Sequence, residues 1–184
     1  MTQQHENRRV RMTKRLLKDA LLELMQKQDL IKISVTAICE TADVHRSTFY
    51  NYYTDPNDLL REIEQDILDR IPIPPQTLEA QSQKALHDAT IEFFDYIRDN
   101  KKTIQILFNE SSGSNFSSLL VKHLCSGYIP VSEHTDALTA RYIQLYIANG
   151  TVSIMREWVS EDFPVSNETL AELMYTLSRR LSQY

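Results

Sequence analysis

The chain has 184 residues, 42% of them hydrophobic and 24% charged, with a formal net charge of −5 at pH 7. Three glycines and six prolines, together with abundant Leu, Ile, Ala, Glu and Gln, predict an all-α fold, and the periodic apolar segments along the chain indicate about nine helices. Two distant cysteines provide neither a disulfide framework nor a zinc site. The length suits one large domain or a small module followed by a larger one.

The N-terminal segment predicts a basic amphipathic helix of about 20 residues. Leu17, Leu21 and Leu24 form its apolar face. Residues 1–18 carry a local charge of +5, whereas residues 61–184 carry −6. This asymmetry directs a polyanion toward the N-terminal end, although a solubilising basic tail explains the same charges when they are taken alone.

Residues 34–58 predict two short helices, a tight turn and the start of a third helix. Ser34 is an N-cap candidate, and Asp43 tolerates the left-handed backbone that the turn requires. Asp55 and Pro56 open the next helix as N-cap and first helical residue. The second short helix exposes Arg, Ser, Thr, Asn and Tyr side chains, which is typical of a helix-turn-helix.

The run T-A-I-C-E-T-A-D-V-H-R-S-T-F-Y-N-Y-Y-T-D-P-N-D-L-L, residues 36–60, resembles the DNA-binding signature of the TetR family of bacterial transcriptional regulators. The stretch R-S-T-F-Y, residues 46–50, is its most specific part. The family more often has Gly at the position of Asp43, Ser at that of His45, and Lys near Thr54. The resemblance implies a homodimer that binds a palindromic operator in double-stranded DNA.

DNA recognition needs side chains that donate hydrogen bonds to base edges or phosphates. Phe49 is expected to turn inward, which leaves the polar residues around it exposed. The resemblance and this pattern together predict a set of DNA-binding residues: Thr36, Arg46, Ser47, Thr48, Tyr50, Asn51, Tyr52 and Tyr53. Taken singly, each of them is more often an ordinary solvated surface residue.

A helix is also predicted from Asp58 to Ile71, and the sequence I-P-I-P-P at 71–75 cannot continue it. This is the best domain boundary in the chain. We therefore expect a helix-turn-helix DNA-binding domain with its connecting helix at residues 1–71. Residues 72–184 are expected to form an effector-binding and dimerisation domain.

The segment from about Thr135 to Val159 has apolar residues on two sides, so it is expected to be covered on two sides. One cover is the core of its own domain, and the other is a second copy of the chain. A last helix after Pro164 is expected to join this dimer. The predicted interface residues are Ile147, Ile154, Met174, Leu177 and Leu181.

The resemblance further implies a pocket for a small effector among the C-terminal helices. The aromatic candidates are Phe93, Tyr96, Phe108, Phe116, Tyr142, Tyr146 and Trp158, although ordinary core packing explains the same spacing. The region from F-F-D-Y-I-R-D-N-K to R-E-W resembles a TetR subgroup of Gram-positive bacteria. One branch of that subgroup activates dihydroxyacetone-kinase operons through a protein co-activator, so a protein co-regulator is the alternative to a small molecule.

The sequence contains no glycine-rich phosphate loop and no hydrolase or metalloprotease motif, so no catalytic residue, metal or cofactor is predicted. Neither a signal peptide nor an apolar run of ~18–20 residues is visible, which predicts a cytoplasmic protein with no membrane contact. The expected function is transcriptional repression, and the alternative is an activator or a DNA-bound adaptor controlled by a protein partner.

Overall fold

The computed structural model describes residues 2–72, 83–109, 112–126 and 135–182. These residues form nine α-helices and one short 3-10 helix, with no strand among them. The predicted all-α class with about nine helices is confirmed. Pro74 and Pro75 of the predicted domain boundary lie outside the described residues.

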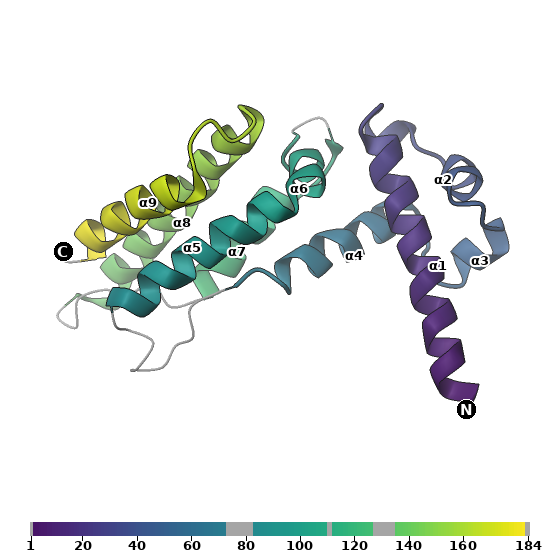
Figure 1. Cartoon of the computed structure of the whole chain (residues 1–184), viewed down its shortest axis with the longest axis horizontal. Helices are drawn as coiled ribbons and strands as arrows, with labels where there is room; N and C mark the ends of the chain where they lie inside the picture. The colour runs from purple at the N-terminus through teal and green to yellow at the C-terminus, as the bar shows by residue number, and fades with distance from the viewer. Residues whose placement is uncertain (1, 73–82, 110–111, 127–134, 183–184) are drawn as a thin grey trace. The chain divides into compact units, whose positions relative to one another are not determined.

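The chain divides into two compact units. Unit 1 comprises Met1–Ile67 and Ile106–Ser114, and unit 2 comprises Leu68–Gln105 and Asn115–Tyr184. Unit 1 contains the helices α1 (Thr2–Met25), η1 (Leu30–Lys32), α2 (Val35–Ala42), α3 (Arg46–Tyr50) and α4 (Pro56–Leu68). Helix α1 packs against α2, and α2 packs against α3 (Figure 1). The fully buried side chains of this unit are Leu17, Leu21, Ile38, Phe49, Leu59 and Leu107.

Local capping defines the helix-turn-helix of unit 1. The Ser34 hydroxyl accepts the Ala37 N–H at 3.1 Å, which caps α2. Asp43 ends α2 in the left-handed conformation, with φ 51° and ψ 49°, and its N–H points back at α2 carbonyls. The Asp55 carboxylate accepts the Asp58 N–H at 2.9 Å ahead of α4. The Ser34 and Asp55 side chains therefore fix where α2 and α4 begin, and the left-handed backbone of Asp43 fixes where α2 ends.

A segment from later in the chain completes unit 1. The Ser114 hydroxyl donates to a carboxylate oxygen of Glu64 at 2.7 Å, and Glu64 is only 2% exposed on α4. Gly113 has φ +75°, and a Cβ built on it would lie 3.6 Å from the Leu30 Cβ in η1. Residues 106–109 and 112–114 thus belong to the packing of unit 1 although they follow α5 in the chain.

Unit 2 is a helical bundle whose elements lie largely alongside one another. Its helices are α5 (Gln83–Asp99), most of α6 (Lys101–Phe108), α7 (Phe116–Ser126), α8 (Ala137–Ser160) and α9 (Asn167–Ser182). Helix α5 packs along α9, α7 packs along α8, and α8 also contacts α9 (Figure 1). The core of the unit is therefore shared by α5, α7, α8 and α9.

An aromatic cluster holds the turn between α8 and α9. The Trp158 ring lies edge-on to Phe94 at 5.6 Å and to Phe163 at 4.6 Å between centroids. The Trp158 indole N–H donates to the Val165 carbonyl at 2.9 Å. Phe163 and Asp162 both have positive φ, and the Lys101 ammonium lies 2.5 Å from an Asp162 carboxylate oxygen. This tight turn keeps α8 and α9 antiparallel neighbours.

Candidate nucleic-acid interface

Helix α3 presents polar side chains to solvent on one face and anchors itself with the other. Phe49 is fully buried, whereas Arg46, Ser47, Tyr50 and Asn51 are exposed. The exposed four make no side-chain hydrogen bond or ion pair with the residues that the structure describes. Tyr50 contacts Phe49 edge-on with 5.6 Å between ring centroids, and the residue is 53% exposed. The face is therefore free to meet a ligand.

The other predicted DNA-binding residues are divided between exposed and covered positions. Thr36 is exposed in the first turn of α2, and Thr48 and Tyr52 are half-buried. Tyr53 is only 3% exposed, so it cannot make the phosphate contact expected of it. Its ring packs against Phe49 at 5.6 Å and under the Lys14 ammonium at 5.4 Å. Burial raises the pKa of the Tyr53 phenol above its ordinary value, and the negative charge of the Glu62 carboxylate raises it further.

A charged network between α1 and α4 lies beside the buried Tyr53 ring. The Lys18 ammonium lies 2.7 Å from a Glu62 oxygen and 2.6 Å from an Asp66 oxygen. Lys14 lies 2.9 Å from the other Glu62 oxygen. Two of the basic residues in the N-terminal segment are therefore neutralised by α4, and their charges do not face a ligand.

The remaining cations of α1 are open to solvent. Arg8, Arg9 and Arg11 are exposed and form no ion pair with any described side chain. Arg15 lies 3.6 Å from Asp19, but both side chains are more than half exposed, so water screens this pair strongly. Arg8, Arg9, Arg11 and Arg15 on α1, together with Arg46 on α3, are thus exposed cations that a polyanion can reach.

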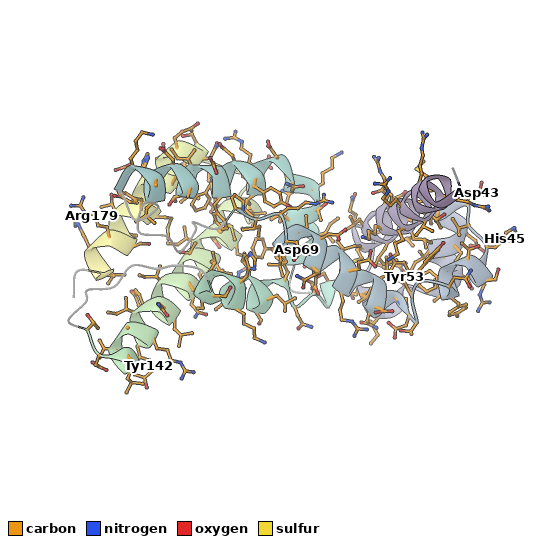
Figure 2. The ribbon with its side chains drawn as sticks, turned by 90° about the horizontal axis from the view of Figure 1, so that it is seen from below. Asp43, His45, Tyr53, Asp69, Tyr142 and Arg179 are labelled. Atoms are coloured by element: carbon orange, nitrogen blue, oxygen red, sulfur yellow. The ribbon has the colours of Figure 1, made fainter. Side chains whose placement is uncertain are left out.

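One further exposed side chain at the start of α3 was not among the predicted residues. His45 is the N-cap of α3, and its ring makes no capping hydrogen bond. Figure 2 shows it at the outer edge of unit 1. The sequence signal that could have identified it is its position, since an N-cap is normally occupied by Ser, Thr, Asp or Asn.

The aromatic residues predicted to line a pocket are not equivalent in the structure. Phe93, Phe108, Phe116 and Trp158 are buried and Tyr96 is half-buried, whereas Tyr142 and Tyr146 are 61% and 69% exposed. Figure 2 shows Tyr142 on the outside of α8. A groove of about 470 Å³ lies between α5 and α9, and none of the seven aromatic residues lines it. Its lining residues are His87, Ile91, Glu168, Thr169 and Glu172.

The residues predicted for the dimer interface also differ in exposure. Ile147 and Met174 are buried within unit 2, so they leave little surface for a second chain. Ile154 and Leu181 are half-buried, and Leu177 is 40% exposed. The apolar side chains that α8 and α9 do expose are Leu138, Tyr142, Tyr146, Leu173 and Leu177. Periodicity thus assigned two core residues, Ile147 and Met174, to the surface.

Residues 84–180, just over half of the chain, match the TetR family described as the transcriptional regulator C-terminal region. The chain belongs to the TetR family of transcriptional regulators. Membership places it among helix-turn-helix regulators of transcription rather than among enzymes. In the described parts of this regulator, no group of three or more His, Cys, Asp or Glu side chains is arranged to hold a metal ion. No helix there is long and apolar enough to cross a membrane.

Known relatives agree with this membership. The regulator is 26% identical over 176 residues to YxbF of Bacillus subtilis, an uncharacterised helix-turn-helix transcriptional regulator, with 88% of this chain covered. It is 38% identical over 60 residues to DhaS of Lactococcus lactis, the transcriptional activator of the dhaKLM operon, with 32% of this chain covered. The matches cover 43% of YxbF and 32% of DhaS, so each sequence match spans less than half the length of the curated relative.

Solved structures share the fold at lower identity. A TetR transcriptional regulator from Streptococcus agalactiae superimposes with a TM-score of 0.72 at 18% identity, covering 95% of this chain and 98% of that one. The structure of the dihydroxyacetone kinase operon activator DhaS gives a TM-score of 0.64 at 22% identity, covering 92% and 96%. These likenesses establish a TetR-like fold for the whole described chain.

Proposed function

We propose that this regulator binds a palindromic operator in double-stranded DNA as a homodimer and represses transcription until an effector releases it. Residues 1–71 act as the DNA-binding domain with its connecting helix. Residues 72–184 hold the effector and the dimer contacts. Thr36, Arg46, Ser47, Tyr50 and Asn51 are the residues that meet the DNA.

The observation that carries this proposal is the free polar face of α3. Arg46, Ser47 and Asn51 are exposed and have no hydrogen-bond or ion-pair partner among the described side chains, and Phe49 anchors the helix from the other side. In a helix-turn-helix the N-terminal residues of the second helix reach base edges in the major groove. Arg is the residue that most often reads guanine there, and Asn is suited to adenine. The face therefore has the chemistry needed for sequence-specific recognition.

Exposed apolar surface on α8 and α9 supports the dimer. Leu138, Tyr142, Tyr146 and Gly150 follow one another at intervals of four residues along α8, so they lie along one side of the helix. A Cβ placed on Gly150 would meet nothing within 4 Å. Glycine inside a helix destabilises it, and no neighbour in the single chain requires the glycine. Close approach of a second copy of this chain accounts for both the exposed apolar row on α8 and the glycine at position 150.

Likeness to DhaS favours activation as a second candidate for the sign of regulation. DhaS is described as an operon activator, and a 60-residue segment of this chain is 38% identical to it. A protein co-regulator then takes the role of the small effector. In-vitro transcription from a promoter that carries the selected operator separates the two candidates, because a repressor lowers the transcript and an activator raises it.

DNA binding itself is tested by selecting duplexes from a random pool with the parent protein. We expect a palindromic consensus with two half-sites separated by about 34 Å or a multiple of the helical repeat.

Substitutions on α3 test which side chains make the contacts. Arg46→Ala and Tyr50→Ala should each weaken binding to the selected duplex by about 1–3 kcal/mol without changing the oligomeric state. Arg179→Ala, which removes an exposed cation from α9, is the matched control and should bind like the parent. If the parent protein enriches no sequence from the random pool, the proposed function is wrong.

A further inference from the structure

The start of α3 differs from the starts of α2 and α8. Ser34 caps α2 through its hydroxyl, and the Asp136 carboxylate accepts the N–H groups of Leu138 and Thr139 at the start of α8. His45 occupies the same position for α3, and its side chain makes no capping hydrogen bond. The residue thus gives the helix none of the stabilisation that its position normally provides.

The backbone of His45 is nevertheless held firmly. Its carbonyl accepts the N–H groups of Thr48 at 2.9 Å and Phe49 at 3.2 Å. Phe49 is fully buried, so the helix that begins at His45 is anchored in the core of unit 1. On the other side, the left-handed Asp43 and the bond from the Val44 N–H to the Cys39 carbonyl at 2.9 Å fix the turn. The Cα–Cβ bond of His45 therefore has a defined direction.

The imidazole at the end of that bond is uncommitted. His45 is exposed, and its ring forms no hydrogen bond, ion pair or ring contact with the residues that the structure describes. Figure 2 shows its side chain directed away from the body of unit 1. A locally unfavourable residue in a well-ordered element is expected where function, and not stability, determines the side chain.

We propose that His45 is a specificity-determining residue that donates an imidazole N–H to a purine acceptor in the major groove of the operator. This inference rests on the proposed DNA-binding function. N-terminal residues of a recognition helix contact base edges, and guanine offers N7 and O6 as acceptors there. Arg46 and Ser47 follow His45 directly on the exposed face, so the three side chains read neighbouring positions of one half-site.

Two substitutions at this position separate base reading from a structural role. His45→Ser introduces a good N-cap, so the melting temperature of the protein should stay the same or rise. Its affinity for the selected operator should nevertheless fall roughly five- to twenty-fold, and the base preference at one position of each half-site should flatten. His45→Gln should move the preference at that same position toward adenine, because a carboxamide pairs with adenine N6 and N7.

The measurement is selection from a random duplex pool with the parent and both variants, followed by titration of the operator and a random duplex. Unchanged base preferences in both variants would overturn the proposal. An equal loss on operator and random duplex, with a smaller salt dependence, would also overturn it, because that pattern indicates a phosphate contact. If the parent enriches no sequence, the proposed DNA-binding function itself is wrong. If Arg46→Ala binds the operator more weakly than the parent but His45→Ser has the affinity and base preference of the parent, only the role of His45 is wrong.

Discussion

The ammonium nitrogen of Lys18 lies 2.7 Å from a carboxylate oxygen of Glu62, and this contact joins α1 to α4 inside unit 1. Burial lowers the pKa of Lys18, but hydrogen bonds to Asp66 and Glu62 outweigh burial and raise it above its ordinary value. Burial likewise raises the pKa of the Glu62 carboxyl, but the bonds from Lys18 and Lys14 hold it below its ordinary value. Both shifts favour the charged forms in the folded protein.

The first prediction is an acid-sensitive fold that depends on Glu62. A carboxylate whose pKa is lowered by folding contributes stability above its unfolded pKa, near 4.3, and loses it as the pH falls through the folded value. We expect the melting temperature of the parent to fall between about pH 5 and pH 3. Glu62→Gln should cost about 1–3 kcal/mol at pH 7 and make the melting temperature less dependent on pH in that range.

The control for this prediction is an exposed ion pair at the C-terminal end of α1. Lys27 lies 2.8 Å from Glu23, but both side chains are more than half exposed. Glu23→Gln should therefore leave the pH profile of the melting temperature close to that of the parent. If Glu62→Gln retains the full acid dependence of the parent, other carboxylates are responsible and the network around Lys18 has no such role.

The second prediction concerns the exposed arginines of α1. Replacing Arg8, Arg9 and Arg11 with Gln should lower affinity similarly for the operator and for random DNA. The slope of log affinity against log salt should flatten by up to about 3 units, because each lost phosphate contact releases roughly one fewer counterion. Arg179→Gln with Arg180→Gln on α9 should leave the slope unchanged. An unchanged slope in the α1 variant would mean that these arginines form a solubilising tail.

Local sequence predicted the helix-turn-helix because its determinants are local. Ser34 and Asp55 cap their helices as expected, and Asp43 adopts the left-handed turn. Each of these features depends on hydrogen bonds that span at most four residues. Phe49 was also predicted correctly as the apolar anchor, since one large apolar side chain among polar neighbours indicates which side of a short helix is buried.

Partners that are distant in sequence could not be predicted in the same way. Lys18 meets Glu62 and Asp66 only because α1 and α4 pack together, and this packing also buries Tyr53. Counting the basic residues of α1 without the carboxylates of α4 that neutralise Lys14 and Lys18 therefore overstates the positive charge available to DNA. Periodicity on α8 failed for a related reason. It shows that Ile147 lies on an apolar row, but it cannot show which row the bundle covers.

The third prediction is that the 106–114 segment stabilises unit 1. Ser114 donates a hydrogen bond to the buried carboxylate of Glu64. Ser114→Ala removes a bond to a buried charged group and should lower the free energy of unfolding by about 1–3 kcal/mol in urea titrations. Gly113→Ala should also lower the free energy of unfolding, by about 1 kcal/mol, because its φ of +75° is strained for any residue with a Cβ.

The control for both variants is Ser118→Ala on the exposed face of α7, which should melt like the parent. If both test variants are as stable as the parent, this segment contributes little to the stability of unit 1.

The fourth prediction is that charge on the exposed face of α9 separates the dimer and thereby abolishes tight operator binding. Leu173 and Leu177 are 49% and 40% exposed, one helical turn apart, so Glu at both positions leaves the core of a single chain intact. In a dimer seam the same two carboxylates would be buried without partners, at a cost of several kcal/mol. Light scattering should report a monomer, and circular dichroism should report unchanged helix content.

Loss of the dimer should then appear directly in DNA binding. A monomer presents one recognition helix, whereas a palindromic operator requires two. The double variant should therefore bind a single half-site and the full palindrome with similar affinity. Ser118→Glu with Gln26→Glu adds the same charge at exposed positions of α7 and of the turn after α1, and it should remain dimeric. If the Leu173→Glu, Leu177→Glu variant also stays dimeric, the second copy covers a different face of unit 2, and the exposed apolar residues of α9 have another role.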